Sequence, residues 1–283
     1  MTDPQPLAEV VDPIVVVAFE GWNDAADAAT GVIDHLIDAW DAEQLAEIDP
    51  EDYYDFQVNR PLIGYDDEGV RVITWPTTRL YVARPVGADR DLLLIRGLEP
   101  NMRWRGYCDE LLTWVDHFGA QLVVTLGALL ADSPHTRPVP VTGHTSDAGV
   151  SRTLDLDPSR YEGATGINGV FAGTVGGNGV PCVSLWAAVP HYVAQPPCPK
   201  ATLALLGRLE DLLELSLPLG DLVEDARAWE RGVDELARED VEIGEYVEAL
   251  EQARDTSELP EASGEAIARE FERYLKRRQR GSD

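Results

Sequence analysis

Four short runs of mostly apolar residues recur along the chain, each flanked by polar or turn-forming residues. They occupy residues 14–19, 92–95, 122–126 and 183–187. Their apolar side chains stand at successive rather than alternate positions, as in parallel strands that are covered on both faces. We therefore expect these runs to form the central strands of an α/β sheet that has helices on both sides.

Between these runs, apolar residues recur at the three- and four-residue spacing of helices. Three such stretches cover residues 25–40, 101–118 and 199–216. Asn23 or Asp24 is the expected cap of the first helix, and Asn101 is the expected cap of the second, which Gly119 ends. The alternation of strands and helices predicts a doubly wound α/β core.

Two parts of the chain depart from this alternation. Residues 45–48 are expected to form a further short strand, and residues 56–85 contain short β-like segments separated by turns. The acidic stretch 66–69 predicts a hairpin turn, so we expect an antiparallel excursion from the main sheet. Residues 151–159 are too short and polar for an assignment.

Helical spacing dominates the chain after residue 218. Residues 221–258 contain 14 acidic and 4 basic side chains, and their apolar residues form two helical stripes. A third stripe comprises Ile267, Phe271, Tyr274 and Leu275. We expect a core of residues 1–218 and a helical segment, 219–283, that packs on the core or on a neighbouring subunit. Because isolated helices of this kind depend on packing, the stripes predict a homo-oligomer.

The stretch 161–193 combines a glycine-rich loop, a helix start and the end of a strand. Thr165 is the expected N-cap of that helix, and Asn168 stands where its side chain can also meet the first free N–H groups. Polar or small residues also follow other predicted strands, at 20–24, 96–99, 127–128, 143–146 and 190–192. Parallel strands bring such ends to one edge of a sheet, where ligands or partners bind.

This edge predicts a candidate pocket. Its residues are Glu20, Asn23, Arg96, Glu99, Thr165, Gly166, Asn168 and His191. A free helix N-terminus attracts an anion by ~0.3–1 kcal/mol, and Arg96 would add a full charge. The alternative is a structural ion pair between Arg96 and Glu20 or Glu99 that closes the edge. An open cleft with an unpaired Arg96 favours a ligand site, whereas a clamped Arg96 favours the ion pair.

Charge narrows the range of partners. The chain has 23 Lys and Arg against 51 Asp and Glu, a formal net charge of −28. Such a surface repels nucleic acids and anionic membranes, so neither is expected as a partner. No apolar run is long enough to span a bilayer, and residues 1–12 do not resemble a secretory signal. The three cysteines form no close pair, which predicts reduced thiols in a cytoplasmic protein.

No motif in the chain specifies a chemistry. The sequence has no phosphate-binding loop, no dinucleotide-binding glycine pattern and no nucleophile elbow. Its five histidines lack metal-ligand spacing. His191 follows a strand and is a candidate general base, although a structural hydrogen bond explains it more simply. We therefore expect no metal and no cofactor, and identify no catalytic residue.

Five segments carry a resemblance to a known family. They are FEGWNDA at 19–25, RGLEP at 96–100, HTRPVPVTG at 135–143, SRYEGATGI at 159–167 and SLWAAVPHYV at 184–193. In these segments the chain resembles the prokaryotic, specifically actinobacterial, branch of the proteasome assembly chaperone 2 family. The resemblance implies a three-layer α/β/α core like that of nucleoside phosphorylases and peptidyl hydrolases, and a homo-oligomer, expected to be a trimer.

Two functions from different classes follow. The first is a non-enzymatic chaperone or scaffold with proteasome-related or other protein partners, because the eukaryotic relatives help to assemble the proteasome α-ring. The sequence ends in Arg280, Gly281, Ser282 and Asp283, so the hydrophobic-Tyr-x tail by which some partners dock on the proteasome is not expected to act here. The alternative is a nucleotide- or anion-binding enzyme or sensor that uses the candidate pocket.

Overall fold

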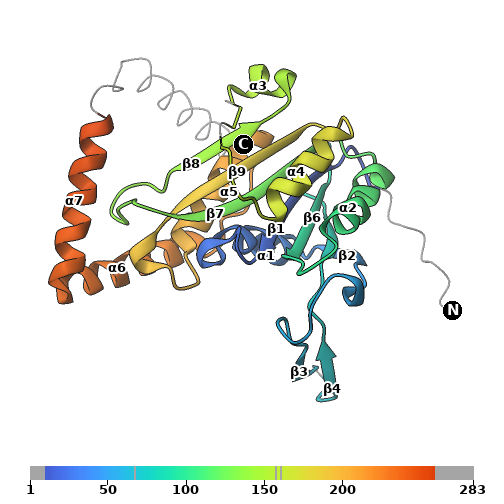
Figure 1. Ribbon diagram of the computed structural model, residues 1–283, viewed down its shortest axis with the longest axis horizontal. Helices are drawn as coiled ribbons and strands as arrows, with labels where there is room; N and C mark the ends of the chain where they lie inside the picture. Colours follow the sequence, from blue (N-terminus) through green and yellow to red (C-terminus); the bar gives the residue numbers. More distant parts are fainter. Residues whose placement is uncertain (1–9, 67, 157, 160, 259–283) are drawn as a thin grey trace.

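A seven-stranded sheet forms the centre of the molecule (Figure 1). The computed structural model describes residues 10–66, 68–156, 158–159 and 161–258. The strand order is β2-β5-β6-β1-β7-β9-β8. The strands are β1 (Ile14–Glu20), β2 (Glu43–Glu47), β5 (Arg79–Ala83), β6 (Leu92–Leu98), β7 (Leu122–Ala131), β8 (Val141–Thr145) and β9 (Cys182–Pro190). The four predicted central strands are confirmed as β1, β6, β7 and β9, which are parallel neighbours.

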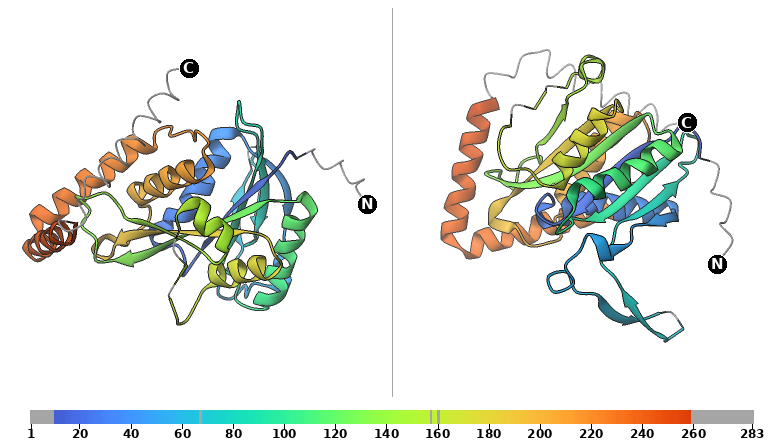
Figure 2. Two further views of the ribbon diagram at one scale, coloured as in Figure 1. Left: turned by 90° about the horizontal axis from the view of Figure 1, so that it is seen from above. Right: turned by 45° about the vertical axis from the view of Figure 1, so that its right-hand side comes forward.

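Helices cover both faces of this sheet, as Figure 2 shows from above. Helices α1 (Ala28–Trp40) and α5 (Pro199–Leu213) lie on one face, and α2 (Trp104–Phe118) and α4 (Ile167–Gly177) on the other. Alternate residues of β1 enter two separate cores: Val16 packs in the core that contains α1, and Val15 in the core that contains α2. This period-two alternation produces the three-layer α/β/α sandwich. Within the described residues, no helix is both long and apolar enough to cross a membrane.

The antiparallel strands at both edges of the sheet were only partly predicted. The expected strand at 45–48 is β2, which begins two residues earlier and ends one residue earlier, and β2 and β5 run antiparallel. Residues 80–83 belong to β5 of the main sheet rather than to the excursion, because β5 pairs with β6. At the other edge, the strand expected to end at residues 143–146 is β8, and the short helix α3 (Ala148–Leu154) had no prediction from the sequence. Both are short, and their polar residues hide the periodicity that identifies strands and helices.

Two of the expected helix caps work differently from the prediction. The Asp24 carboxylate accepts the backbone N–H groups of Ala29 and Thr30, but the 3-10 turn η1 (Ala25–Asp27) separates it from α1. Asn101 does not cap α2, which begins at Trp104. Its side-chain oxygen accepts the backbone N–H of Asp55 and the side-chain amide of Asn59 instead. Asn101 therefore anchors the start of the excursion rather than a helix.

The buried carboxyl group of Asp24 makes stability depend on pH. Burial raises its pKa from 3.8 to about 6, although hydrogen bonds from Thr30 and Ala29 act in the opposite direction. A raised pKa means that the folded state holds the proton more tightly, so stability is lost as pH rises through this range. Relative to Asp24→Asn, we expect the wild-type free energy of unfolding to fall by about 2 kcal/mol between about pH 4.5 and about pH 7.5.

Urea unfolding of both proteins across this pH range measures the difference. The many other carboxyl groups titrate in both proteins, so their contribution cancels. Parallel pH profiles, or a wild type that gains stability relative to Asp24→Asn as pH rises, would contradict the prediction.

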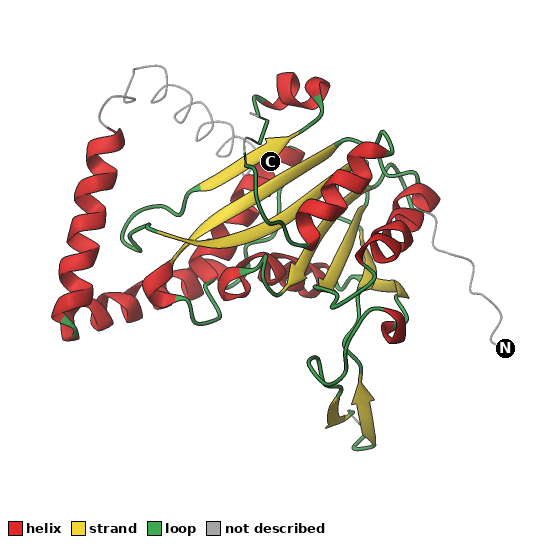
Figure 3. Ribbon diagram, in the orientation of Figure 1, coloured by secondary structure: helices red, strands yellow, loops and turns green. Residues whose placement is uncertain are grey.

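The excursion forms an arm that projects from the core (Figures 2 and 3). We define the arm as residues 56–78; it contains the two-stranded sheet of β3 (Leu62–Tyr65) and β4 (Arg71–Thr74). The Phe56 and Trp75 rings meet at its base, with 4.9 Å between their centroids. Large apolar side chains of the arm are exposed: Val58, Leu62, Ile63, Tyr65, Val70, Val72, Ile73 and Trp75.

Helices α6 (Leu222–Glu239) and α7 (Val241–Glu258) follow the sandwich. Leu222 of α6 is buried in the core that contains α1 and α5. Trp229 packs against the same core, and ion pairs add to the contact: Lys200 pairs with Glu230 at 3.1 Å, and Arg137 with Glu251 at 3.1 Å. The third predicted stripe, 267–275, lies outside the described residues.

Candidate functional site

A carboxylate joins three segments at the carboxyl edge of the sheet. Glu99, which follows β6, accepts hydrogen bonds from Asn23 Nδ2 and from the backbone N–H of Ile167, both at 2.9 Å. Ile167 is the first residue of α4, and Asn23 is only 1% exposed. Glu99 therefore caps α4 from a distant part of the chain, and its negative charge lies at the positive end of the helix dipole.

Thr165 does not cap α4 as expected. The N-cap is Gly166, and no side chain of the cap residue bonds to the helix. A Cβ at Gly166 would overlap the Asn23 amide, so only glycine lets Asn23 pass this close to the helix start. Because Glu99 already accepts the Ile167 N–H, the Thr165 hydroxyl is left at the surface of a pocket described below.

The other expected residues do not all converge. Arg96 Nη1 donates to Glu20 at 2.8 Å and its Nε to Asp34 at 3.2 Å. Residues two apart on a strand point to the same face of the sheet. Leu94 points to the face that α1 covers, so Arg96 also points to that face and not to the face that α4 covers. The structure thus shows the ion pair rather than an unpaired cation, with Glu20 and Asp34 as partners in place of Glu99.

Asn168 and His191 also lie apart from this junction. Asn168 is buried and donates its amide to the carbonyl oxygen of Leu126, so it bonds to β7 and not to the first turn of α4. β9 continues to Pro190, beyond the level at which β1 ends, and carries His191 past the edge. There His191 Nδ1 lies 3.4 Å from Asp132, and its ring meets Tyr246 of α7.

The residues at 143–146 end a strand that runs in the opposite direction. β8 is antiparallel to β9, and Thr145 lies beside Val183 near the start of β9. The carboxyl end of β8 is therefore at the opposite edge of the sheet from Glu99. The prediction that all these ends share one edge was wrong for β8, because it assumed parallel strands throughout.

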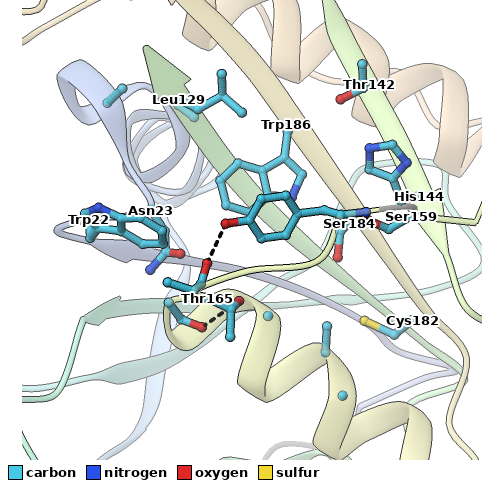
Figure 4. A pocket seen from close by; sticks show the side chains of 18 of the residues that line it. Trp22, Asn23, Leu129, Thr142, His144, Ser159, Thr165, Cys182, Ser184 and Trp186 are labelled. Atoms are coloured by element: carbon cyan, nitrogen blue, oxygen red, sulfur yellow. Dashed lines mark hydrogen bonds between the residues drawn. The ribbon is translucent and has the colours of Figure 1, made fainter. Parts of the chain in front are cut away.

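A pocket of about 880 Å³ opens on the α4 face of the sheet (Figure 4). We call it the β9 pocket. Ser184 and Trp186 of β9 and Thr142 and His144 of β8 line it, opposite α4. Of the eight expected residues, the β9 pocket includes Asn23, Thr165 and Gly166, and excludes Glu20, Arg96, Glu99, Asn168 and His191.

Trp186 owes its position to a glycine on the neighbouring strand. Gly127 of β7 pairs with Trp186 in register, and a Cβ at Gly127 would lie 2.7 Å from the indole ring. The missing side chain lets the indole lie over β7. At the mouth of the pocket, Trp22 is 67% exposed and Tyr161 is 69% exposed. Aromatic surface is therefore present both inside the pocket and at its entrance.

Comparison with known proteins identifies the fold family. The family model described as PAC2 family matches residues 18–237, which is most of the chain. The chain belongs to the PAC2 family. The resemblance recognised in the sequence is thereby confirmed. No curated protein matches the chain.

Two solved structures of high identity accompany this match. A PAC2 family protein from Streptomyces avermitilis is 61% identical, with a TM-score of 0.79, over 83% of this chain and 100% of that chain. A Mycobacterium tuberculosis protein titled proteasome-assembly chaperone homologue is 55% identical, with a TM-score of 0.75, over 83% and 99%. A Pyrococcus furiosus protein titled an archaeal proteasome activator is 17% identical with a TM-score of 0.64, over 82% and 95%, and shows the shared fold alone.

The residues of this PAC2 chain that sequence reasoning missed are those of β9 and β8. Cys182, Ser184 and Trp186 occupy alternate positions of β9, and their neighbours Val183 and Leu185 enter the α5 core. That alternation of polar or aromatic residues with aliphatic ones indicates a strand that is only partly covered on one face. This alternation was present in the sequence, but residues 183–187 are apolar enough to resemble a strand that is buried on both faces.

The thiol in the β9 pocket of this PAC2 chain is not activated. Cys182 lines the pocket, but burial raises the pKa of this thiol to about 12, so it is neutral and a poor nucleophile at pH 7. The three cysteines are free and buried. No cluster of His, Cys, Asp and Glu with the geometry of a metal site occurs in the part of the chain that the structure describes.

Proposed function

We propose that this PAC2 chain is a cytoplasmic, homo-oligomeric and non-enzymatic assembly chaperone or scaffold with proteasome-related protein partners. One observation carries the proposal. The Mycobacterium tuberculosis protein titled proteasome-assembly chaperone homologue is 55% identical to this chain and is matched over 99% of its length.

The arm supports a function based on protein contacts. Leu62 is 70% exposed and Tyr65 is 75% exposed, and the paired Ile63 and Ile73 are also exposed. A two-stranded hairpin is at best marginally stable in water, and large exposed apolar patches mark interaction sites. The arm therefore has both the composition and the position of an interface element.

A nucleotide- or anion-binding enzyme draws less support from the site. Glu20 and Asp34 already neutralise Arg96, which was the cation expected to attract an anion. The β9 pocket contains no Asp, Glu, Lys or Arg among its described lining residues, so it offers no carboxylate–cation pair for acid–base chemistry.

The partner can be tested directly with purified proteins. We expect this chain to bind isolated proteasome α subunits from the same source and to raise the yield of assembled rings when it is co-expressed with them. An equally acidic unrelated protein serves as the charge control. Failure to bind either α or β subunits, together with an unchanged yield of rings, would remove the proteasome from the proposal.

Charged substitutions in the arm are expected to change the oligomeric state. Ile63 and Ile73 face each other across the hairpin, so Ile63→Asp with Ile73→Asp places two charges on one face of the arm. Buried in an interface, these carboxylates would remain unpaired. We expect light scattering to give three times 31.1 kDa for the wild type and 31.1 kDa for the double variant.

Val86→Asp is the matched control, because Val86 is 99% exposed and lies outside the arm. We expect this variant to keep the wild-type mass. A wild type of 31.1 kDa at micromolar concentration would contradict homo-oligomerisation. A double variant that remains a trimer would show that the interface lies elsewhere.

A further inference from the structure

The β9 pocket exists because one helical layer stops short of the edge of the sheet. Helices α2 and α4 pack over the middle strands, whereas β9 and β8 extend beyond them (Figure 1). Thr142 lies beside Trp186, and His144 beside Ser184, in the antiparallel register of these two strands. These rows of side chains line a cavity of about 880 Å³, within the range of about 300–1,000 Å³ that is typical of small-molecule sites.

The described residues that line the pocket are uncharged, although the protein is strongly charged. Charged residues make up 26% of the sequence, and the formal net charge is −28. Nevertheless, the described residues that line the β9 pocket include no Asp, Glu, Lys or Arg. A charged ligand would lose its hydration there without gaining an opposite charge. The pocket therefore favours an uncharged ligand.

Small residues of α4 leave room opposite the aromatic groups. Gly169, Ala172 and Gly173 lie on the side of α4 that lines the pocket, while Trp186 lies on the sheet side. A Cβ at Gly173 would meet no atom within 4 Å, so the space in front of it is open. These small residues leave space for a planar ring beside the indole of Trp186, and aromatic rings stack or meet edge to face.

Two residues that line the pocket, Asn23 and His144, each have a buried polar atom without a partner among the described residues. The carboxylate of Glu99 can only accept hydrogen bonds, so the Nδ2 group of Asn23 must point toward it. The amide oxygen of Asn23 is then left without a hydrogen bond. Figure 4 shows this oxygen on the side of the amide that faces Trp186. The Nδ1 atom of His144 is likewise buried and unpartnered. A ligand that carries an N–H or O–H donor would satisfy the Asn23 oxygen, since buried polar atoms are costly when unpaired. The His144 nitrogen accepts or donates according to the tautomer of its ring.

We propose that the β9 pocket binds an uncharged, aromatic small molecule that carries at least one hydrogen-bond donor. Trp186 and the small residues of α4 hold the ring, and the amide oxygen of Asn23 selects the donor. The β9 pocket is separate from the arm. A negative result for ligand binding in the pocket would therefore leave the proposed scaffold function unaffected, and a negative result for the scaffold function would leave the pocket proposal unaffected.

A pair of related fluorescent probes tests both the shape and the charge of the ligand. N-phenylnaphthylamine is neutral, aromatic and carries an amine N–H, whereas anilinonaphthalene sulfonate has a similar skeleton with an anionic group. Gly173→Leu fills the pocket from a position with open space. Gly177→Leu, on the same helix and outside the pocket, also meets no atom within 4 Å and is the matched control. Replacing glycine in a helix improves its helix propensity, so we expect both variants to fold.

We expect the wild type to bind one molecule of N-phenylnaphthylamine per chain and the sulfonate more weakly. Gly173→Leu should weaken binding of the neutral probe about tenfold or more, and Gly177→Leu should leave it unchanged. Circular dichroism and thermal unfolding confirm that both variants are folded. Three outcomes would overturn the proposal: no saturable binding of the neutral probe, equal binding by the two variants, or tighter binding of the sulfonate.

Discussion

Glu99→Ala is expected to lower the free energy of unfolding by about 2–4 kcal/mol. The substitution removes the acceptor of two hydrogen bonds, from Asn23 Nδ2 and from the N–H of Ile167. Asn23 is buried, so its amide would lose its partner without gaining water, and α4 would lose the charge at its N-terminus. Urea unfolding with a fitted midpoint and slope measures the change.

A conservative variant separates the hydrogen bonds from the charge. Glu99→Gln keeps one acceptor oxygen at this position, so we expect it to cost less than half as much as Glu99→Ala. The Asn23→Ala variant already lacks the amide. Adding Glu99→Ala to that variant should therefore lower the free energy of unfolding by about 1 kcal/mol or more less than Glu99→Ala does in the wild type. Additive effects of the two substitutions would mean that Glu99 stabilises the chain without acting through Asn23.

The centre of the fold could be predicted from the sequence because burial on both faces leaves a direct pattern. Four apolar runs identified β1, β6, β7 and β9, and helical spacing identified the layers around them. The edges were harder, since β2 and β8 are short and partly polar. The sequence contains no periodicity that distinguishes such strands from loops, and it does not state the direction in which an edge strand runs.

The candidate site could be predicted only in part. The rule that the ends of parallel strands share one edge correctly placed Asn23, Glu99 and Gly166 close together. Asn23 follows β1, Glu99 follows β6, and Gly166 precedes α4. The same reasoning failed for Arg96, because it ignored the face on which a strand residue points. It failed for His191 because strands of unequal length do not end at the same level.

The pocket escaped prediction for a different reason. Its walls come from β8, whose antiparallel direction was not predicted, and from the small residues of α4. Glycines in a helix commonly allow close packing of the helix on a sheet. Instead, no atom lies within 4 Å of a Cβ at Gly173, so this glycine maintains a cavity rather than a contact.

Gly97→Ala is expected to destabilise the chain by about 3–5 kcal/mol, which is more than the expected cost of Glu99→Ala. Gly97 lies in β6, and a Cβ there would approach Phe19 Cδ1 to 2.5 Å and Thr78 Oγ1 to 2.8 Å. Phe19 is fully buried and packs against the rings of Tyr107 and Phe171. It therefore has no space into which to move.

Thr78 cannot move without breaking a buried network. Its hydroxyl lies 2.5 Å from Tyr107 Oη and 3.1 Å from Tyr54 Oη, and Tyr54 also donates to the carbonyl of Leu98. Displacing Thr78 would leave these hydroxyl groups without partners in the core, which adds the cost of unpaired polar groups to that of overpacking. The added methyl group thus disturbs an aromatic cluster and a hydrogen-bond network together.

Gly64→Ala provides the matched control for this prediction. Gly64 is also a strand residue, in β3 of the arm, but a Cβ there meets no atom within 4 Å. We expect its unfolding free energy to stay within about 0.5 kcal/mol of the wild type. Because the two substitutions add the same methyl group to a β-strand, a difference in urea midpoint reports the surroundings of Gly97 alone. Equal midpoints would show that Phe19 and Thr78 can yield, and that the packing between β6, β1 and α2 is looser than the contacts indicate.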